Sequence, residues 1–249
     1  MATNERLRQA MVRRGYDLET LALRVDASAK SVERWITGKA LPYPKTRYQV
    51  AAALGEDVGY LWPETVDPGA LAGAELLTTY ARRADVPHTL WTDLLRQSER
   101  DVDLLAFAGL FLTEEHRDWL PLLRAKADAG ARVRILVGDP DGYELARRDA
   151  EHRIGGGVAG RVAAVLAHYE PLSDAVELRL HDTPLYNSIY RFDDDMLVNV
   201  HVYGLLAAYT PVLRLRRIDG SFFNTYIESF ERVWASARAW SPSPAPVSR

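Results

Sequence analysis

The sequence predicts two successive folds: an all-α domain of five short helices over residues 1–65 and an α/β domain over residues 70–240. Between them, "WPETVDPGALAG" (62–73) holds prolines and glycines that interrupt regular structure and mark a domain boundary. Residues 1–50 carry 10 Lys and Arg against 5 Asp and Glu, whereas the whole chain has a net charge of −3. A basic segment joined to an acidic body is typical of a nucleic-acid-binding module attached to another domain.

Capping residues delimit the helices of the first domain. The helices are expected at residues 4–14, 18–25, 29–37 and 44–54, with a short turn at 58–61. Asp17 and Ser28 can accept hydrogen bonds from the first-turn amides of the second and third helices. Gly15 and Gly38 follow the first and third helices, where a C-cap glycine is favoured. Pro44 suits the first turn of the fourth helix.

The second domain alternates strands and helices. Strand candidates span 101–109, 131–140, 175–182, 187–204 and 211–220, and helix candidates span 70–98, 114–130, 158–169 and 222–240. The first two strands and the helix between them are joined by short connections, which favours a parallel βαβ unit. Asp193–Asp195 predicts a tight hairpin. The final segment, "SPSPAPVSR" (241–249), is rich in proline and serine and is expected to be disordered.

The second and third helices are spaced as a pair that packs closely. Ala22 is small where the two helices meet, and Asp26 stands at the turn. Val32 and Trp35 lie on one face of the third helix, and Trp35 is expected in the core. The opposite face presents Ala29, Lys30, Glu33 and Arg34 at the N-terminal end of the helix. Such a face can enter a DNA major groove, where Lys and Arg bond guanine and Glu accepts from cytosine.

Residues 5–62 resemble the helix-turn-helix domain of the Xre/Cro/C1 repressor superfamily. "LALRVDASAKSVERWITGKALP" (21–42) carries the Leu-Ala, the Val, the Arg-Trp and the Gly-Lys…Pro of that family at its spacing. Asp26 replaces the usual turn glycine, and Ile36 stands where the family often has Glu. The resemblance implies DNA contacts from Ser28, Ala29, Lys30, Ser31, Glu33, Arg34, Lys39, Lys45 and Arg47, with Lys39, Lys45 and Arg47 on phosphates. The alternative is a helical bundle whose charged faces are merely solvated.

The second domain is similar to phospholipase D-like proteins in "WLPLLRAKADAGARVRILVGDP" (119–140), a helix that ends in glycine and feeds a strand. "LYNSIYRFDDDMLV" (185–198) falls where that superfamily has its catalytic His-x-Lys-x4-Asp, and here the positions read Asn187, Ile189 and Asp194. That chemistry needs an imidazole nucleophile and a cation on the phosphate. The resemblance therefore implies a non-catalytic relative, like the uncharacterised C-terminal domain found behind Xre-type heads in actinobacterial regulators.

Polar residues gather in the strand segment 187–204. Alternation along the strand places Asn187, Ile189, Arg191 and Asp193 on one face and Ser188, Tyr190 and Phe192 on the other. Together with His201, the polar side chains of Asn187, Arg191 and Asp193 predict a polar pocket for an anionic or nucleotide-like ligand. The alternative is a structural ion pair between Arg191 and a carboxylate.

Two further patterns are weaker. His116 with Glu114 or Glu115 offers metal-ligating groups, but no second histidine follows at helical spacing, so a solvated face is expected and no metal. "RIGGGVAG" (153–160) is either a phosphate-cradling loop before a helix or a flexible loop. No cofactor and no catalytic residue are expected.

The sequence therefore predicts a DNA-binding transcriptional regulator that binds a palindromic double-stranded operator as a homodimer and whose second domain dimerises and senses a ligand or a protein partner. Cysteine is absent and there is no run of 18 apolar residues, which favours a cytoplasmic, nucleoid-associated protein and no membrane span. One rival is a DNA-targeted phosphodiesterase or nuclease of the phospholipase D-like superfamily. The other is a partner-binding scaffold.

Overall fold

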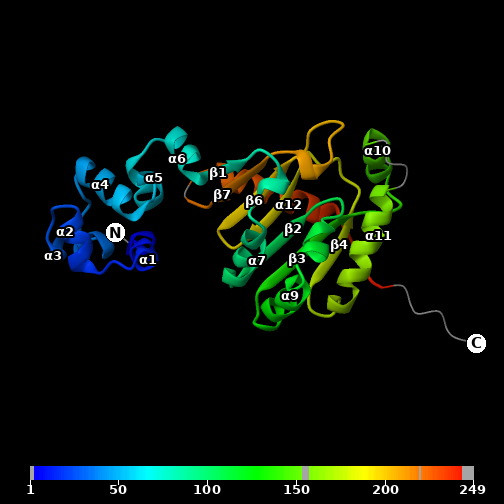
Figure 1. Cartoon of the computed structure of the whole chain (residues 1–249), viewed down its shortest axis with the longest axis horizontal. Helices are drawn as coiled ribbons and strands as arrows, with labels where there is room; N and C mark the ends of the chain where they lie inside the picture. Colours follow the sequence, from blue (N-terminus) through cyan, green and yellow to red (C-terminus); the bar gives the residue numbers. More distant parts are fainter. Residues whose placement is uncertain (1–2, 153–156, 219, 243–249) are drawn as a thin grey trace, which may run out of the picture. The chain divides into compact units, whose positions relative to one another are not determined.

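The computed structural model describes residues 3–152, 157–218 and 220–242. The chain divides into two compact units, which are drawn in Figure 1. Unit 1 comprises Met1–Glu75 with Ile218–Phe222, and unit 2 comprises Leu76–Arg217 with Phe223–Arg249. No helix within the described residues is long and apolar enough to cross a membrane.

Unit 1 is built from short helices. They are α1 (Glu5–Arg14), α2 (Leu18–Arg24), α3 (Ala29–Ile36), α4 (Pro44–Leu54), α5 (Val58–Leu61), the 3-10 helix η1 (Pro63–Thr65) and α6 (Pro68–Glu75). The first five match the expected helices to within one residue at each end. Their core contains Leu7, Leu21, Val32, Leu54 and Leu61, all nearly inaccessible to solvent. Burial of these apolar side chains stabilises helices that are too short to persist alone.

Side chains cap four of these helices at their N-termini. The side chains of Asn4, Asp17, Ser28 and Asp57 accept hydrogen bonds from first-turn amides of α1, α2, α3 and α5. Helix α4 differs, because Tyr43 precedes it and makes no side-chain cap. The first-turn amides of α4 are therefore left without a side-chain acceptor.

Unit 2 is an α/β domain, as the sequence predicts. Its elements are β1 (Leu76–Tyr80), η2 (Arg83–Asp85), α7 (His88–Gln97), β2 (Asp101–Leu105), α8 (Phe111–Glu115), α9 (Trp119–Asp128), β3 (Arg132–Gly138), α10 (Tyr143–His152), α11 (Gly157–Tyr169), η3 (Glu170–Leu172), β4 (Glu177–His181), β5 (Asn187–Phe192), β6 (Asp195–Val200), η4 (Ala207–Tyr209), β7 (Val212–Arg216), α12 (Phe222–Ser236) and β8 (Arg238–Ala239). The strands form one mixed sheet in the order β1-β7-β6-β5-β2-β3-β4-β8.

Strand pairing confirms two local predictions. Strands β2 and β3 run parallel, as expected for a βαβ unit, and β4 continues the parallel section. Strands β5 and β6 form the expected hairpin, with Phe192 paired to Asp195 and Asp193 at φ 52° in the left-handed region of the turn. Helices α7, α9 and α11 cover one face of the sheet and α12 covers the other (Figure 1).

Several predicted element boundaries are wrong. The helix expected over 70–98 is interrupted by strand β1, because Thr78, Thr79 and Tyr80 favour extended backbone and pair with β7. The helix expected over 114–130 is two helices, α8 and α9, and the sequence did not predict α10 at all. The loop residues 153–156 and the tail residues 243–249 lie outside the described residues.

Candidate functional site

Helices α2 and α3 meet through a tight turn. Asp26 has φ 52°, so this aspartate adopts the left-handed backbone that a glycine often supplies. The amide of Ala27 donates to the carbonyl of Ala22 at 2.9 Å and closes the turn. Ala22 is buried, so the two helices can approach each other closely, and Trp35 lies in the core as expected.

The outer face of α3 is open. Lys30, Glu33 and Arg34 are exposed, whereas Ala29 and Ser31 are half-buried. Ser28 is exposed but already acts as a helix cap, since its Oγ accepts the amide of Ser31 at 3.1 Å. The serine is therefore occupied in shaping the helix, and the two cations and the carboxylate are the groups with freedom to contact a ligand.

The cations near α3 and α4 are not neutralised inside the protein. Lys30, Arg34, Lys39 and Lys45 are exposed and form no ion pair among the described residues. Arg47 is half-buried, and its Nε is buried without a hydrogen-bond partner. By contrast, Arg8 and Arg13 on α1 each pair with a glutamate at 2.7 Å. The unpaired positive charge of unit 1 thus includes the residues that the sequence assigned to DNA.

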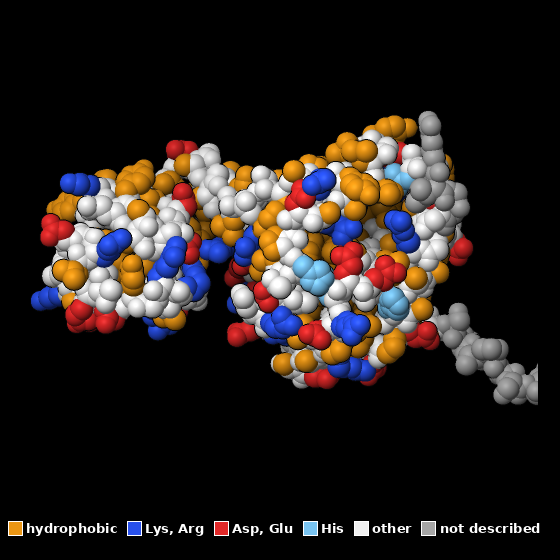
Figure 2. All heavy atoms as spheres, in the orientation of Figure 1, with side chains coloured by type: hydrophobic (Ala, Val, Ile, Leu, Met, Phe, Trp, Pro, Cys, Tyr) orange, Lys and Arg blue, Asp and Glu red, His pale blue; other side chains and the backbone are white. Residues whose placement is uncertain are grey.

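Unit 2 contains a cavity of about 370 Å³. Phe107, Phe111 and Tyr190 form its apolar wall. Its polar groups come from Arg83, Arg148, His152, Arg161, Ser188 and His201, with Glu114 and Glu115 at α8. Figure 2 shows basic, acidic and histidine side chains close together on the face of unit 2 that it draws. Such a mixture of aromatic surface and a few polar groups is characteristic of small-molecule sites.

Hydrogen bonds fix the tautomer of His201. Burial lowers the pKa of His201 to about 4, so the ring is neutral at pH 7. Its Nδ1–H donates to the carbonyl of Leu185 at 3.1 Å, because a carbonyl can only accept. The Nε2 lone pair therefore accepts the hydroxyl of Ser188 at 3.0 Å. Both ring nitrogens are thus satisfied by the protein itself.

Of the residues predicted to bind a ligand, His201 lines the cavity, and the structure does not bring Asn187, Arg191 or Asp193 to it. Strand alternation is as predicted, but Ser188 and Tyr190 face the cavity and Arg191 lies on the face under α12. The positions matched to the phospholipase D-like motif, Asn187 and Ile189, also lie away from the cavity.

Arg191 is held by carboxylates. Its guanidinium donates to Asp103 and to Asp101 at 2.8 Å each, and to the backbone carbonyl of Asp193 at 2.8 Å. The carboxylate of Asp193 accepts backbone amides of Glu99, Arg100 and Asp101 at 2.7–2.9 Å. These contacts are the structural ion pair that the sequence left open as the alternative for Arg191.

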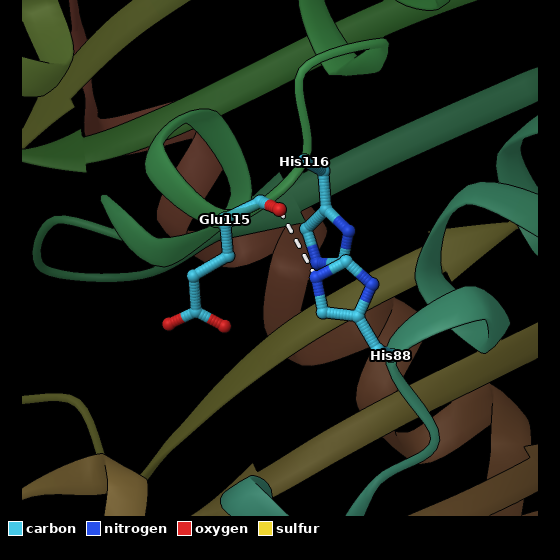
Figure 3. A group of neighbouring side chains, drawn as sticks. All are labelled: His88, Glu115 and His116. Carbon is cyan, nitrogen blue, oxygen red and sulfur yellow. Dashed lines mark hydrogen bonds between the residues drawn. The ribbon is translucent and has the colours of Figure 1, made fainter.

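His116 is 4% exposed, so the expectation of a solvated face is wrong for this residue. Figure 3 shows it beside His88, which α7 brings from a distant part of the sequence, and the ring centroids are 4.1 Å apart. Each of these histidines and Glu115 offers one ligand atom within 4.8 Å of the others. However, His88 Nε2–H donates to the Glu115 carbonyl at 3.0 Å. That bond occupies Nε2 of His88 and leaves the lone pair at Nδ1. The Glu115 side chain is exposed, and we propose no metal site here.

The arginines of the cavity were missed by the sequence analysis. Arg83 lies in η2, Arg148 in α10 and Arg161 in α11. The three arginines come from separate elements, so no regular spacing in the sequence connects them. Only the tertiary fold brings them to one wall of the cavity. The sole local signal is that α10 and α11 each carry a basic residue near the glycine-rich segment 153–160.

Among known proteins, the chain is similar to solved structures, and the similarity is to their folds. No family model matches the chain, and no curated protein matches it. TrmBL2, an archaeal chromatin protein with a novel mode of DNA binding, is 15% identical over 85% of this chain and 70% of its own, with a TM-score of 0.42. Nuc, a phospholipase D family member from Salmonella typhimurium, is 13% identical over 62% of this chain and 90% of its own, with a TM-score of 0.37. Phosphatidylserine synthase from Haemophilus influenzae Rd KW20 is 13% identical over 85% of this chain and 53% of its own, with a TM-score of 0.45.

Proposed function

We propose that the protein is a sequence-specific DNA-binding transcriptional regulator in which α2 and α3 form a helix-turn-helix of the Xre type. The observation that carries this proposal is the contrast between the two faces of α3. Val32 and Trp35 anchor one face in the core, whereas Lys30, Glu33 and Arg34 stand exposed on the other. A major groove admits such a helix, and the three side chains match guanine acceptors and the cytosine amino group.

The N-terminus of α4 supports the same proposal. It has no side-chain cap, while the other four helices of residues 5–61 are capped. Lys45 stands in its first turn and forms no ion pair among the described residues. An uncapped helix N-terminus next to a lysine suits a phosphate group, because the amides and the charge act together. Lys39 and Arg47 are proposed to contact neighbouring phosphates, which position the protein without reading sequence.

Lys30→Ala and Arg34→Ala are each expected to weaken binding to the preferred duplex by about 1–3 kcal/mol, because a base-edge contact is lost. Lys45→Ala should weaken binding to all duplexes alike and reduce the salt dependence by about one unit of slope. Fluorescence anisotropy on a duplex selected from a random pool by the full chain measures both effects. Arg8→Ala, at an exposed arginine paired with Glu5, is the control and should bind normally. Wild-type affinity in both α3 variants would show that α3 does not read the bases.

A single helix-turn-helix contacts few base pairs, so we expect two copies of the chain on a palindromic operator with half-sites about one helical turn apart. Unit 2 is proposed to hold the homodimer. Sedimentation velocity of the free chain at micromolar concentration and of the chain on its operator measures the stoichiometry. A single copy in both experiments contradicts the dimer without affecting the proposal that α3 reads DNA.

The rival function is a phosphodiesterase that uses unit 1 for targeting. It requires an imidazole nucleophile and a cation beside the scissile phosphate. The cavity wall that the structure describes contains no lysine, and both nitrogens of His201 are hydrogen-bonded within the protein. Arg83, Arg161 and the unpaired Nδ1 of His152 do supply cations and an imidazole there, so hydrolysis is disfavoured instead because the sequence lacks the His-x-Lys pair of the phospholipase D-like motif. We therefore favour a cavity that binds without hydrolysing. Hydrolysis of a phosphodiester by the purified chain would reverse this preference.

A further inference from the structure

We propose that the cavity of unit 2 binds a small organic anion that also carries hydroxyl or amino groups, with its anionic group held by Arg83 and Arg161. Sugar phosphates and mononucleotides are members of this chemical class. The ligand binding itself is independent of DNA. Only its regulatory consequence rests on the function proposed above.

The guanidinium groups supply the anion-binding part of the site. Arg83 and Arg161 line the cavity, and neither forms an ion pair among the described residues. The guanidinium of Arg83 lies 3.7 Å from the ring centroid of Phe111, which holds it in place but leaves its charge uncompensated. Arg148 is different, because Glu151 pairs with it at 2.7 Å. Planar guanidinium groups match the oxygens of phosphate and carboxylate, so two unpaired ones at a single cavity favour an anion.

His152 indicates a hydrogen-bond donor on the ligand. Its Nε2–H donates to the carbonyl of Leu205 at 3.1 Å, so the neutral ring presents a lone pair at Nδ1. That Nδ1 is buried and has no hydrogen-bond partner. A buried acceptor without a partner is costly, and a hydroxyl or amino group of a ligand in the cavity would satisfy it. Burial and the nearby Arg148 lower the pKa of His152, which keeps this lone pair available at neutral pH.

The remaining walls fit the same class of ligand. Glu114 and Glu115 are exposed at the cavity and add acceptors for hydroxyl or amino groups, while they make the site unsuitable for an anion without such groups. Phe107 and Tyr190 give a flat apolar surface for a sugar or base ring. The volume of about 370 Å³ lies at the lower end of the range for small-molecule sites and suits a compact ligand.

The ligand would regulate DNA binding only if it binds more tightly to one arrangement of the chain than to another. Under the proposed function, the anion would shift the chain toward or away from its DNA-competent state. This consequence is separate from the binding site, and the experiment below measures the two separately.

The test is isothermal titration of the full chain, without DNA, with ribose 5-phosphate, AMP, inorganic phosphate and ribose. Ribose 5-phosphate or AMP is expected to bind at least tenfold more tightly than inorganic phosphate, and ribose is expected not to bind. Arg83→Gln and Arg161→Gln should each weaken binding by about tenfold or more, because one charge-assisted contact is removed. Arg147→Gln is the matched control, since Arg147 lies on α10, is half-exposed and does not line the cavity.

The proposal is overturned if neither ribose 5-phosphate nor AMP binds at about 10 mM. It is also overturned if the Arg161→Gln variant binds these two ligands as tightly as the Arg147→Gln control does. The third contrary outcome is equal affinity of the chain for ribose and ribose 5-phosphate. Arg161 is exposed, so its variant keeps the test valid if Arg83→Gln does not fold. DNA affinity is then measured with and without the bound anion. If the chain binds no DNA either with or without the anion, the proposed regulator function is rejected and the anion site is unaffected. If the chain binds DNA but no anion, only the anion site is rejected.

Discussion

Asp103→Asn is expected to lower the free energy of unfolding of unit 2 by about 3–5 kcal/mol, the cost of breaking a buried ion pair from one side. Asp103 is 0% exposed and stands between two arginines. Arg134 Nε donates to its Oδ1 at 2.7 Å, and Arg191 donates to its Oδ2 at 2.8 Å. An asparagine of the same shape would leave two buried guanidinium groups facing one neutral amide.

The same network connects the sheet to α12, so its loss should also weaken the packing of α12 on the sheet. Arg134 also makes two hydrogen bonds to Glu231 on α12, at 2.7 and 3.0 Å. Its guanidinium lies over the rings of Phe230 and Trp234, at 4.7 and 5.2 Å from their centroids. Desolvation and the two carboxylates, acting in opposite directions, leave the pKa of Arg134 raised, so the charge is retained.

Scanning calorimetry of the full chain measures the effect, with an expected fall in melting temperature of about 10 °C for the transition of unit 2. Asp194→Asn is the matched control, because Asp194 pairs with Arg100 at 2.7 Å on the surface, with side chains 48% and 60% exposed. Such a pair contributes about 1 kcal/mol or less. If Asp103→Asn melts at the same temperature as the Asp194→Asn control, the buried network around Asp103 does not stabilise unit 2.

Arg191→Ala separates the two interpretations that the sequence left open for this residue. A structural role predicts a lower melting temperature, with DNA binding and its regulation falling only as far as folded protein is lost. A role in ligand sensing predicts altered regulation at an unchanged melting temperature. The contacts of Arg191 with Asp101 and Asp103 favour the structural role.

Local signals explain why unit 1 could be predicted more closely than unit 2. The caps at Asp17 and Ser28 and the glycine after α1 act within a few residues, so the sequence alone places the helix ends. Strand β1 depends instead on pairing with β7, where Leu76 meets Leu215, and no property of residues 76–80 alone reveals that partner.

The candidate cavity shows the same limit. Alternation along β5 correctly separated Ser188 and Tyr190 from Arg191, because it follows from strand geometry. Which of the two faces borders a cavity depends on the helices that cover each face. The sequence therefore predicted a polar pocket at this strand and included His201, which lines the cavity, but it also assigned Arg191, which lies on the opposite face of the strand.

Acid is expected to destabilise unit 2 between about pH 6.5 and pH 4, because two buried histidines must remain neutral in the folded state. Burial lowers the pKa of both His181 and His201 to about 4. His181 Nε2 is hydrogen-bonded to the Ala106 carbonyl at 3.2 Å, and His201 is bonded to Leu185 and Ser188. In the unfolded chain, an ordinary histidine has a pKa near 6.5.

The sign follows from which state takes up protons. Below about pH 6.5 the unfolded chain binds a proton at each histidine that the folded chain does not, so the free energy of unfolding falls as the pH falls. The stability is fully present above about pH 6.5, and roughly 3 kcal/mol for each histidine is lost by about pH 4. Urea unfolding of the full chain at closely spaced pH values measures this slope. His181→Gln, whose amide can still donate to the Ala106 carbonyl, should remove about half of it. A free energy of unfolding of unit 2 that stays level from about pH 6.5 to pH 4.5 would show that the two rings are protonated as readily in the folded chain as in the unfolded one.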